Sequence, residues 1–162
     1  MKRRLVAILC TAVLSLSLVA CGSGEEKKDT AKEGTTTSTE LKDGTYEAET
    51  KEADENGGTA KVKVVVKDGK ITEANYNEMT KDGNKRENES YNKMMKEKAG
   101  TSPSEYEVEI EKKVVEKQSA DFDAVSGATT SSNKAKQLFN AALDNAKEGK
   151  TEKASVEIKE AK

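Results

Sequence analysis

The sequence predicts a small domain of the α+β class, preceded by an export signal and a linker. Three observations predict this class: valines that alternate with lysines, a glycine-containing turn directly after them, and an apolar stripe of helical period near the end of the chain. The chain has 162 residues, of which 36% are charged and 4% are aromatic. A chain of this length and composition accommodates one domain with a polar surface and a small core.

The strand signals lie in the first half of the domain. Residues 43–50 predict a first strand, because their side chains alternate between two sides of an extended chain. One side carries Thr45, Glu47 and Glu49, and the other carries Tyr46, Ala48 and Thr50. Valines alternate with lysines in residues 61–67, and Asp68 and Gly69 then supply a tight turn, because glycine tolerates a positive φ. Residues 71–79 are therefore expected to be the returning strand of a β-hairpin.

Helical periodicity predicts two helices, one in the middle of the chain and one near its end. Residues 89–98 and residues 131–147 place apolar side chains three and four positions apart. Residues 81–90 are expected to form a polar loop before the first of them. The charged residues 150–162 are expected to be a frayed tail beyond the domain.

The stretch between these helices is ambiguous. Apolar side chains alternate with glutamates in residues 105–110, as they would in a strand. However, Ser102, Pro103 and Glu105 occupy the N-cap, N1 and N3 positions of a capping box. We therefore predict a helix for this stretch, within residues 101–119.

The first twenty residues predict export. Three basic residues precede an apolar run that is short for a membrane span and ends at a cleavage-like site, so residues 1–20 are interpreted as a signal peptide. An uncleaved N-terminal anchor is the alternative. The tetrapeptide "LVAC", which ends at Cys21, resembles a bacterial lipobox. This resemblance implies that Cys21 carries lipid on the outer side of the cytoplasmic membrane. Residues 22–40 contain no large apolar side chain and are expected to be a flexible tether, so residues 21–40 comprise the lipidated cysteine and the linker.

The composition excludes several kinds of chemistry. The chain contains no histidine, and its two cysteines are Cys10, inside the signal peptide, and Cys21. We therefore expect no catalytic residues, no disulfide and no metal site in the domain. A hydrolase is disfavoured, because no general base accompanies the serines of the domain. The net charge of −2 does not indicate a protein that binds nucleic acid. Any redox chemistry would need an organic cofactor.

A cluster of hydroxyl side chains precedes the last predicted helix, in the sequence "DAVSGATTSSNKAKQLF" of residues 123–139. Serine and threonine commonly cap helices, because their oxygens accept the free N–H groups of the first turn. A helix start is also a phosphate site, because its N–H groups and dipole attract anions. Local chemistry leaves both interpretations open, with Ser131 or Ser132 as the cap and Thr129 just outside the helix.

The motif "DAVSGAT" resembles the Asp-x-x-Ser/Thr-Gly-Ala-Thr pattern of FMN-binding domains. These occur in subunits of the sodium-pumping NADH:quinone reductase and in small lipoproteins of Gram-positive bacteria that serve extracellular electron transfer. The likeness to the lipoprotein branch extends over about residues 41–147, and we assign residues 41–149 to the domain. It implies an α+β fold with a small antiparallel sheet packed with helices, and a flavin loop that leads into the C-terminal helix.

The resemblance also implies a site. In the family, a flavin transferase moves FMN from FAD to the last threonine of the motif, as a phosphoester. Carried over, that residue is Thr129, and one covalent FMN is expected. The other cofactor-binding residues expected from the motif and its flank are Asp123, Ser126, Gly127, Ala128 and Thr130.

The expected function is that of a lipoprotein on the extracellular face of the cell membrane that relays electrons through FMN. The expected partners are a Mg-dependent flavin transferase with FAD as donor, a membrane electron donor such as a quinone-linked dehydrogenase, and membrane lipid through Cys21. The alternative is a cofactor-free lipoprotein module that binds a protein or solute at the cell surface.

Overall fold

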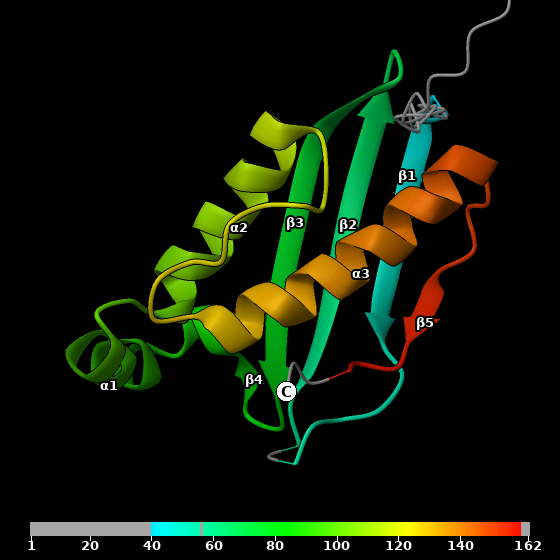
Figure 1. Cartoon of the computed structure of the whole chain (residues 1–162). Helices are drawn as coiled ribbons and strands as arrows, with labels where there is room; N and C mark the ends of the chain where they lie inside the picture. Colours follow the sequence, from blue (N-terminus) through cyan, green and yellow to red (C-terminus); the bar gives the residue numbers. More distant parts are fainter. Residues whose placement is uncertain (1–39, 56, 160–162) are drawn as a thin grey trace, which may run out of the picture. The chain divides into compact units, whose positions relative to one another are not determined.

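A five-stranded sheet with three α-helices makes up the part of the chain that the computed structural model describes, residues 40–159 except residue 56 (Figure 1). The predicted signal peptide, Cys21 and all but the last residue of the predicted tether lie outside the described residues. In chain order the elements are β1 (Gly44–Thr50), β2 (Thr59–Lys67), β3 (Lys70–Thr80), β4 (Gly83–Asn84), the 3-10 helix η1 (Lys85–Glu87), α1 (Glu89–Ala99), α2 (Pro103–Lys117), α3 (Thr129–Glu148) and β5 (Ala154–Val156).

The sheet has the order β4-β3-β2-β1-β5. All neighbours are antiparallel except β1 and β5, which are parallel. The predicted α+β class is confirmed, but the sheet is mixed rather than antiparallel. The difference arises in the segment 150–162, where a frayed tail was expected. Instead β5 pairs with the free edge of β1, and the Lys51 amide donates to the Val156 carbonyl at 2.8 Å.

The predicted hairpin is formed by β2 and β3. Asp68 and Gly69 both have positive φ, 52° and 70°, which is the geometry of a type I′ turn. The turn pairs Lys67 with Lys70, and the register shifts once, between Val65 and Val66. Turn chemistry and alternation together set this hairpin.

One face of the sheet is covered by helices. In Figure 1, α3 crosses β1 and β2, and α2 lies along β3. The alternation of β2 places its valines at 62, 64 and 66 in the core, where they meet the buried stripe of α3. The core side chains of α3 are Ala135, Leu138, Phe139, Ala142, Leu143 and Ala146. None of the helices within the described ranges is long and apolar enough to span a bilayer.

The ambiguous segment is helical, as predicted, but the serine side chain of its capping box does not cap the helix. The Ser102 hydroxyl instead contacts the Glu105 carboxylate, 3.2 Å away. Lys96 also binds that carboxylate, at 2.7 Å, and Lys96 together with Ser102 lowers the pKa of Glu105. The Ser102 carbonyl accepts the amides of Glu105 and Tyr106.

Helix α2 also closes the outer edge of β3, the edge that faces away from β2. A buried amide without an acceptor is costly, and side chains of α2 supply the acceptors that a further strand would otherwise provide. The pairs are Gln118 with the Ile71 amide at 2.7 Å, Glu111 with the Tyr76 amide at 2.9 Å, and Glu107 with the Glu78 amide at 3.0 Å.

Candidate functional site

The predicted site lies where the connection between α2 and α3 enters α3. Figure 1 shows this connection returning along α2 before α3 begins. Thr129 is the first residue of α3, and Ala128 is its N-cap, with no side-chain cap. The prediction that the helix begins near Ser131 and that Thr129 lies outside it is therefore wrong. The hydroxyl predicted to cap is used elsewhere, since Ser132 Oγ accepts the Val125 amide at 2.9 Å.

The first turn of α3 presents its polar groups to solvent. Thr129 and Thr130 are exposed, as is Ser126 before them. The first main-chain bond of the turn runs from the Ser132 amide to the Ala128 carbonyl, at 2.9 Å. The amides that precede Ser132 are those that an α-helix leaves without intrahelical acceptors, and they carry roughly half a positive charge.

Gly127 fixes the path of the chain into this turn. Its φ is +76°, and a Cβ there would overlap the Ala99 carbonyl oxygen and lie 3.1 Å from Thr101 Cγ2. The position therefore accepts only glycine, both for its backbone conformation and for space. The contact brings the C-terminal end of α1 against the motif, two residues before Thr129.

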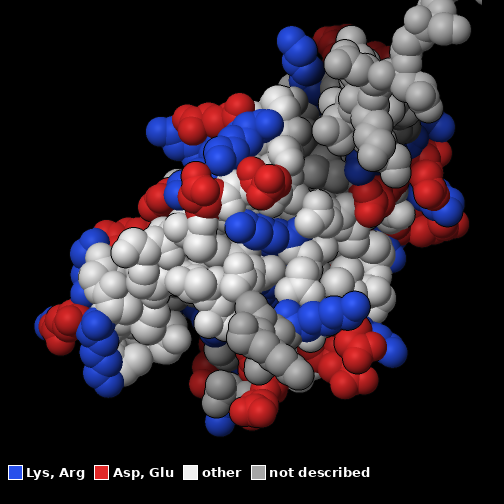
Figure 2. All heavy atoms as spheres, viewed as in Figure 1, with Lys and Arg blue, Asp and Glu red and all other residues white. Residues whose placement is uncertain are grey.

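Asp123 and Ala128 occupy different environments. The Asp123 side chain is almost fully exposed and pairs with Lys117 at 3.3 Å, while its carbonyl accepts from Lys113 at 3.1 Å. Ala128 is buried at 6% exposure. Figure 2 shows a mostly uncharged surface over the start of α3, consistent with the absence of charged residues from 124–133.

A buried polar group that sequence reasoning missed lies behind this turn. We call Tyr76, Glu78 and Tyr106 the hydroxyl–carboxylate cluster; they are 0%, 1% and 2% exposed. The Tyr76 hydroxyl donates to Glu78 Oε1 at 2.6 Å, and the Tyr106 hydroxyl donates to Glu78 Oε2 at 3.0 Å. A signal for this cluster was present, because Glu78 follows Tyr76 by two positions and strand alternation puts both on the core face.

Two lysines balance the charge of the cluster. Lys85 Nζ lies 2.9 Å from Glu78 Oε2, and Lys134 Nζ lies 3.9 Å from Glu78 Oε1. Burial by itself would raise the pKa of Glu78, but Lys85, the Tyr76 hydroxyl and Lys134 hold it below its ordinary value. Burial and the Glu78 charge raise the pKa of both tyrosines, and a hydrogen bond with the Ser131 side chain opposes this at Tyr106. Glu78 is therefore ionised and both tyrosines are neutral at pH 7.

A second buried carboxylate lies beside the cluster. Glu107 is 0% exposed, accepts the Glu78 amide and pairs with Arg86 Nε. Burial raises the pKa of Glu107 to about 7, against the lowering effect of Arg86. Arg86 also donates to the Tyr76 carbonyl and to Glu111 Oε1, each at 2.6 Å.

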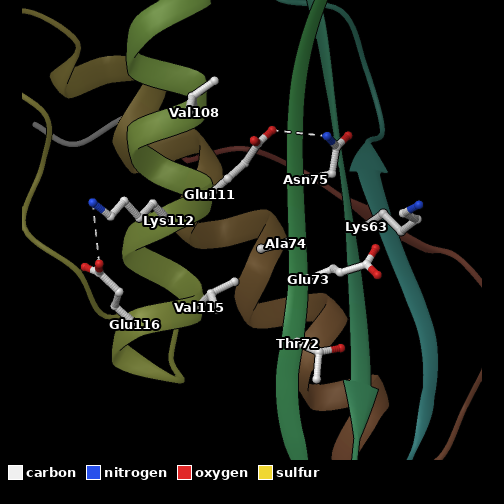
Figure 3. A pocket seen from close by; sticks show the side chains of 10 residues that line it. All are labelled: Lys63, Thr72, Glu73, Ala74, Asn75, Val108, Glu111, Lys112, Val115 and Glu116. Atoms are coloured by element: carbon white, nitrogen blue, oxygen red, sulfur yellow. Dashed lines mark hydrogen bonds and ion pairs between the residues drawn. The ribbon is translucent and has the colours of Figure 1, made fainter.

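A separate groove of about 600 Å³ lies between α2 and the strand side chains on the uncovered side of β3 (Figure 3). Val108 and Val115 line it from α2, and Thr72, Glu73 and Lys63 line it from the sheet. None of its lining residues belongs to 123–130, so it is distinct from the motif. Across the described parts of the chain, no group of histidine, cysteine or acidic side chains is arranged to hold a metal ion.

Comparisons with known proteins identify a matching family model, a similar lipoprotein and a similar solved structure. The family model described as "FMN-binding domain" matches residues 56–144. A protein named "15 kDa lipoprotein" from Treponema pallidum is 31% identical over 114 residues, which cover 69% of this chain and 81% of that protein. A crystal structure of a Clostridium perfringens protein superposes with a TM-score of 0.71 at 49% identity, covering 74% of this chain and 99% of that one.

Proposed function

This chain belongs to the FMN-binding domain family, and we propose that it is a surface-anchored lipoprotein that carries one FMN on Thr129 and relays electrons outside the cytoplasmic membrane. FMN bound there would supply one- or two-electron transfer at its ring, which the side chains of this domain do not offer. The role of the protein is then to hold the cofactor, to position it and to keep it from being lost to the medium.

The observation that carries this proposal is the exposed Thr129 at the start of α3. A phosphate joined to its hydroxyl oxygen would lie beside the free amides and the positive end of a twenty-residue helix. Gly127 lets the chain turn sharply in front of it, and the surrounding surface offers no negative side chain between residues 124 and 133. These features fit a phosphoester at Thr129, with Ser126 and Thr130 as neighbouring hydroxyl donors.

The attachment needs a partner. We propose a Mg-dependent flavin transferase that joins the Thr129 oxygen to the phosphorus of the FMN half of FAD. AMP is the leaving group, and the hydroxyl proton is released to a base of the transferase or to water. Asp123 is exposed five residues before Ala128, and the uncharged surface of Figure 2 gives access to the motif. The proposed electron donor is a membrane protein such as a quinone-linked dehydrogenase.

Thr129→Ala is expected to abolish covalent flavin attachment, because it removes the only oxygen at the attachment position. The full chain is co-expressed with a flavin transferase and its intact mass is measured. Wild type should gain the mass of one FMN, as should Thr59→Ala, which removes an exposed hydroxyl at the start of β2. An FMN adduct that persists in Thr129→Ala would contradict the assignment.

Cys21→Ala is expected to release the protein from the membrane, because two acyl chains bind far more firmly than the polar domain can. The name of the Treponema pallidum relative supports a lipid anchor. Labelled fatty acid should enter wild type and Cys10→Ala, whose substitution lies within the signal peptide, but not Cys21→Ala. Equal labelling of all three chains would refute the anchor.

A second candidate function is a cofactor-free module that binds a protein or solute at the cell surface. The groove between α2 and β3 favours it, because it is open, lies apart from Thr129 and is lined by both polar and apolar side chains (Figure 3). A protein that stays colourless in the presence of a flavin transferase would support this function over the first.

A further inference from the structure

The hydroxyl–carboxylate cluster contacts the turn that carries Thr129. The Tyr76 hydroxyl lies 3.2 Å from the Ser131 carbonyl oxygen, and the Ser131 side chain is near enough to the Tyr106 hydroxyl to lower its pKa. Ser131 is two residues after Thr129, within the same helical turn. The cluster therefore connects β3 and α2 to the first turn of α3 from its buried side.

Few other side-chain hydrogen bonds hold the first turn of α3. Ala128, at the N-cap, has no side chain that can accept a hydrogen bond, so the usual tie between cap and first turn is missing. Ser132 Oγ ties the preceding loop to the helix through the Val125 amide. The Tyr76 hydroxyl then gives the Ser131 carbonyl a side-chain contact in addition to the main-chain bonds of the helix.

The composition of the cluster also favours a positioning role over a purely stabilising one. A buried carboxylate with two counter-charges stabilises a fold little, and well-packed apolar side chains of similar volume would often stabilise it as much or more. Such networks give a unique geometry, because every member must meet its partners in one arrangement. In the described part of the chain, no buried side-chain polar atom lacks a hydrogen-bond partner.

The geometry points to Tyr76, held by Glu78 and supported by Tyr106, as a positioning residue for the modification of Thr129. Its one hydroxyl proton is shared between Glu78 Oε1, the shorter contact, and the Ser131 carbonyl, and this shared bond sets the orientation in which the first turn offers the Thr129 hydroxyl to the transferase. Tyr76 touches neither the cofactor nor the reacting oxygen, and acts through Ser131. This inference rests on the proposed attachment of FMN at Thr129.

The chain offers a matched control at the other end of α3. Tyr46 is also buried, at 1% exposure, and its hydroxyl donates to the Lys42 carbonyl at 2.9 Å. The Lys42 amide in turn binds the Ala146 carbonyl, near the C-terminal end of α3. Tyr46→Phe and Tyr76→Phe therefore both remove the hydroxyl of a buried tyrosine, but only Tyr76→Phe removes it beside the Thr129 turn, where it also takes a donor from Glu78.

The test measures flavin transfer to the full flavin-free chain by a purified transferase, with FAD and Mg²⁺, as a function of protein concentration. Tyr76→Phe should lower kcat by about five- to tenfold, the effect of one hydrogen bond, and Tyr46→Phe should stay within about twofold of wild type. Hydrogen exchange of the flavin-free chains should show faster exchange of the Ser132 amide in Tyr76→Phe only.

The outcomes separate the two proposals. An unchanged kcat and Ser132 exchange rate in Tyr76→Phe, with wild type modified at Thr129, would overturn the positioning role and leave the proposed function standing. An equal loss in both tyrosine variants would trace the effect to overall stability and would also overturn it. A wild-type chain that gains no flavin at Thr129 would overturn both.

Discussion

Gly127→Ala is expected to destabilise the domain strongly and to abolish FMN attachment at Thr129. The methyl group would overlap the Ala99 carbonyl oxygen, a main-chain atom that cannot rotate away, in a residue already held at φ +76°. Left-handed strain costs about 1–2 kcal/mol for a residue with a Cβ, and forced overpacking adds about 1–3 kcal/mol. The loop must move away from α1, and Thr129 moves with it.

Gly100→Ala separates these two costs. Gly100 has the same φ of +76°, but a Cβ there meets no atom within 4 Å. Urea denaturation of the flavin-free chains should show a loss of only about 1 kcal/mol for Gly100→Ala and about 3 kcal/mol for Gly127→Ala. Equal losses would mean that the Ala99 contact does not constrain the loop.

Arg86→Met is expected to give the other large loss, because it leaves Glu107 buried without its charge partner. Arg86 also supplies the donors to Glu111 and to the Tyr76 carbonyl. Removing one partner of a buried ion pair typically costs about 3–5 kcal/mol. The matched control is Lys96→Met, whose partner Glu105 is half exposed, and whose loss should stay below about 1 kcal/mol.

The loss in Arg86→Met should also depend on pH, in a direction that the Glu107 environment fixes. Burial already raises the pKa of Glu107 to about 7, and removing Arg86 removes an influence that lowers it. The folded state then holds the Glu107 proton more tightly than the unfolded state. The stability that the Glu107 proton contributes is fully present below the pKa of Glu107 in the unfolded state. It is lost as the pH rises through the pKa of Glu107 in the folded state.

Thermal or urea unfolding between about pH 5 and pH 8 should therefore show that the free energy of unfolding of Arg86→Met falls as the pH rises. Adding Glu107→Gln to Arg86→Met should remove most of this slope, because the titrating group is gone. A slope that survives in the double variant would assign the pH dependence to another group.

The local elements of the fold were predictable from the sequence, because their causes are local. The hairpin follows from alternation in 61–67 and from Asp68-Gly69, and α3 follows from its apolar stripe. The choice of helix for α2 was also confirmed, although the Ser102 hydroxyl contacts the Glu105 carboxylate and does not cap the helix.

The parts that could not be predicted depend on contacts between distant residues. The start of α3 was misplaced because helix-cap preferences favour Ser131 or Ser132, whereas the fold uses Ser132 to bind the Val125 amide. The strand β5 exists because β1 offers a free edge, and three residues of ordinary composition give no signal for that. The motif residues were found by resemblance, but the support behind them, from β3 and α2, needs the tertiary structure.

The closed outer edge of β3 has a consequence for how many copies can share a membrane. Lipid anchoring, as proposed, would confine the domains to two dimensions, where they meet at high local concentration. An open edge strand would then recruit the edge of its neighbour and start intermolecular sheet growth. Here Gln118, Glu111 and Glu107 occupy the main-chain amides that such growth would use. At the opposite edge β5 offers only three residues, which is a short template for such growth.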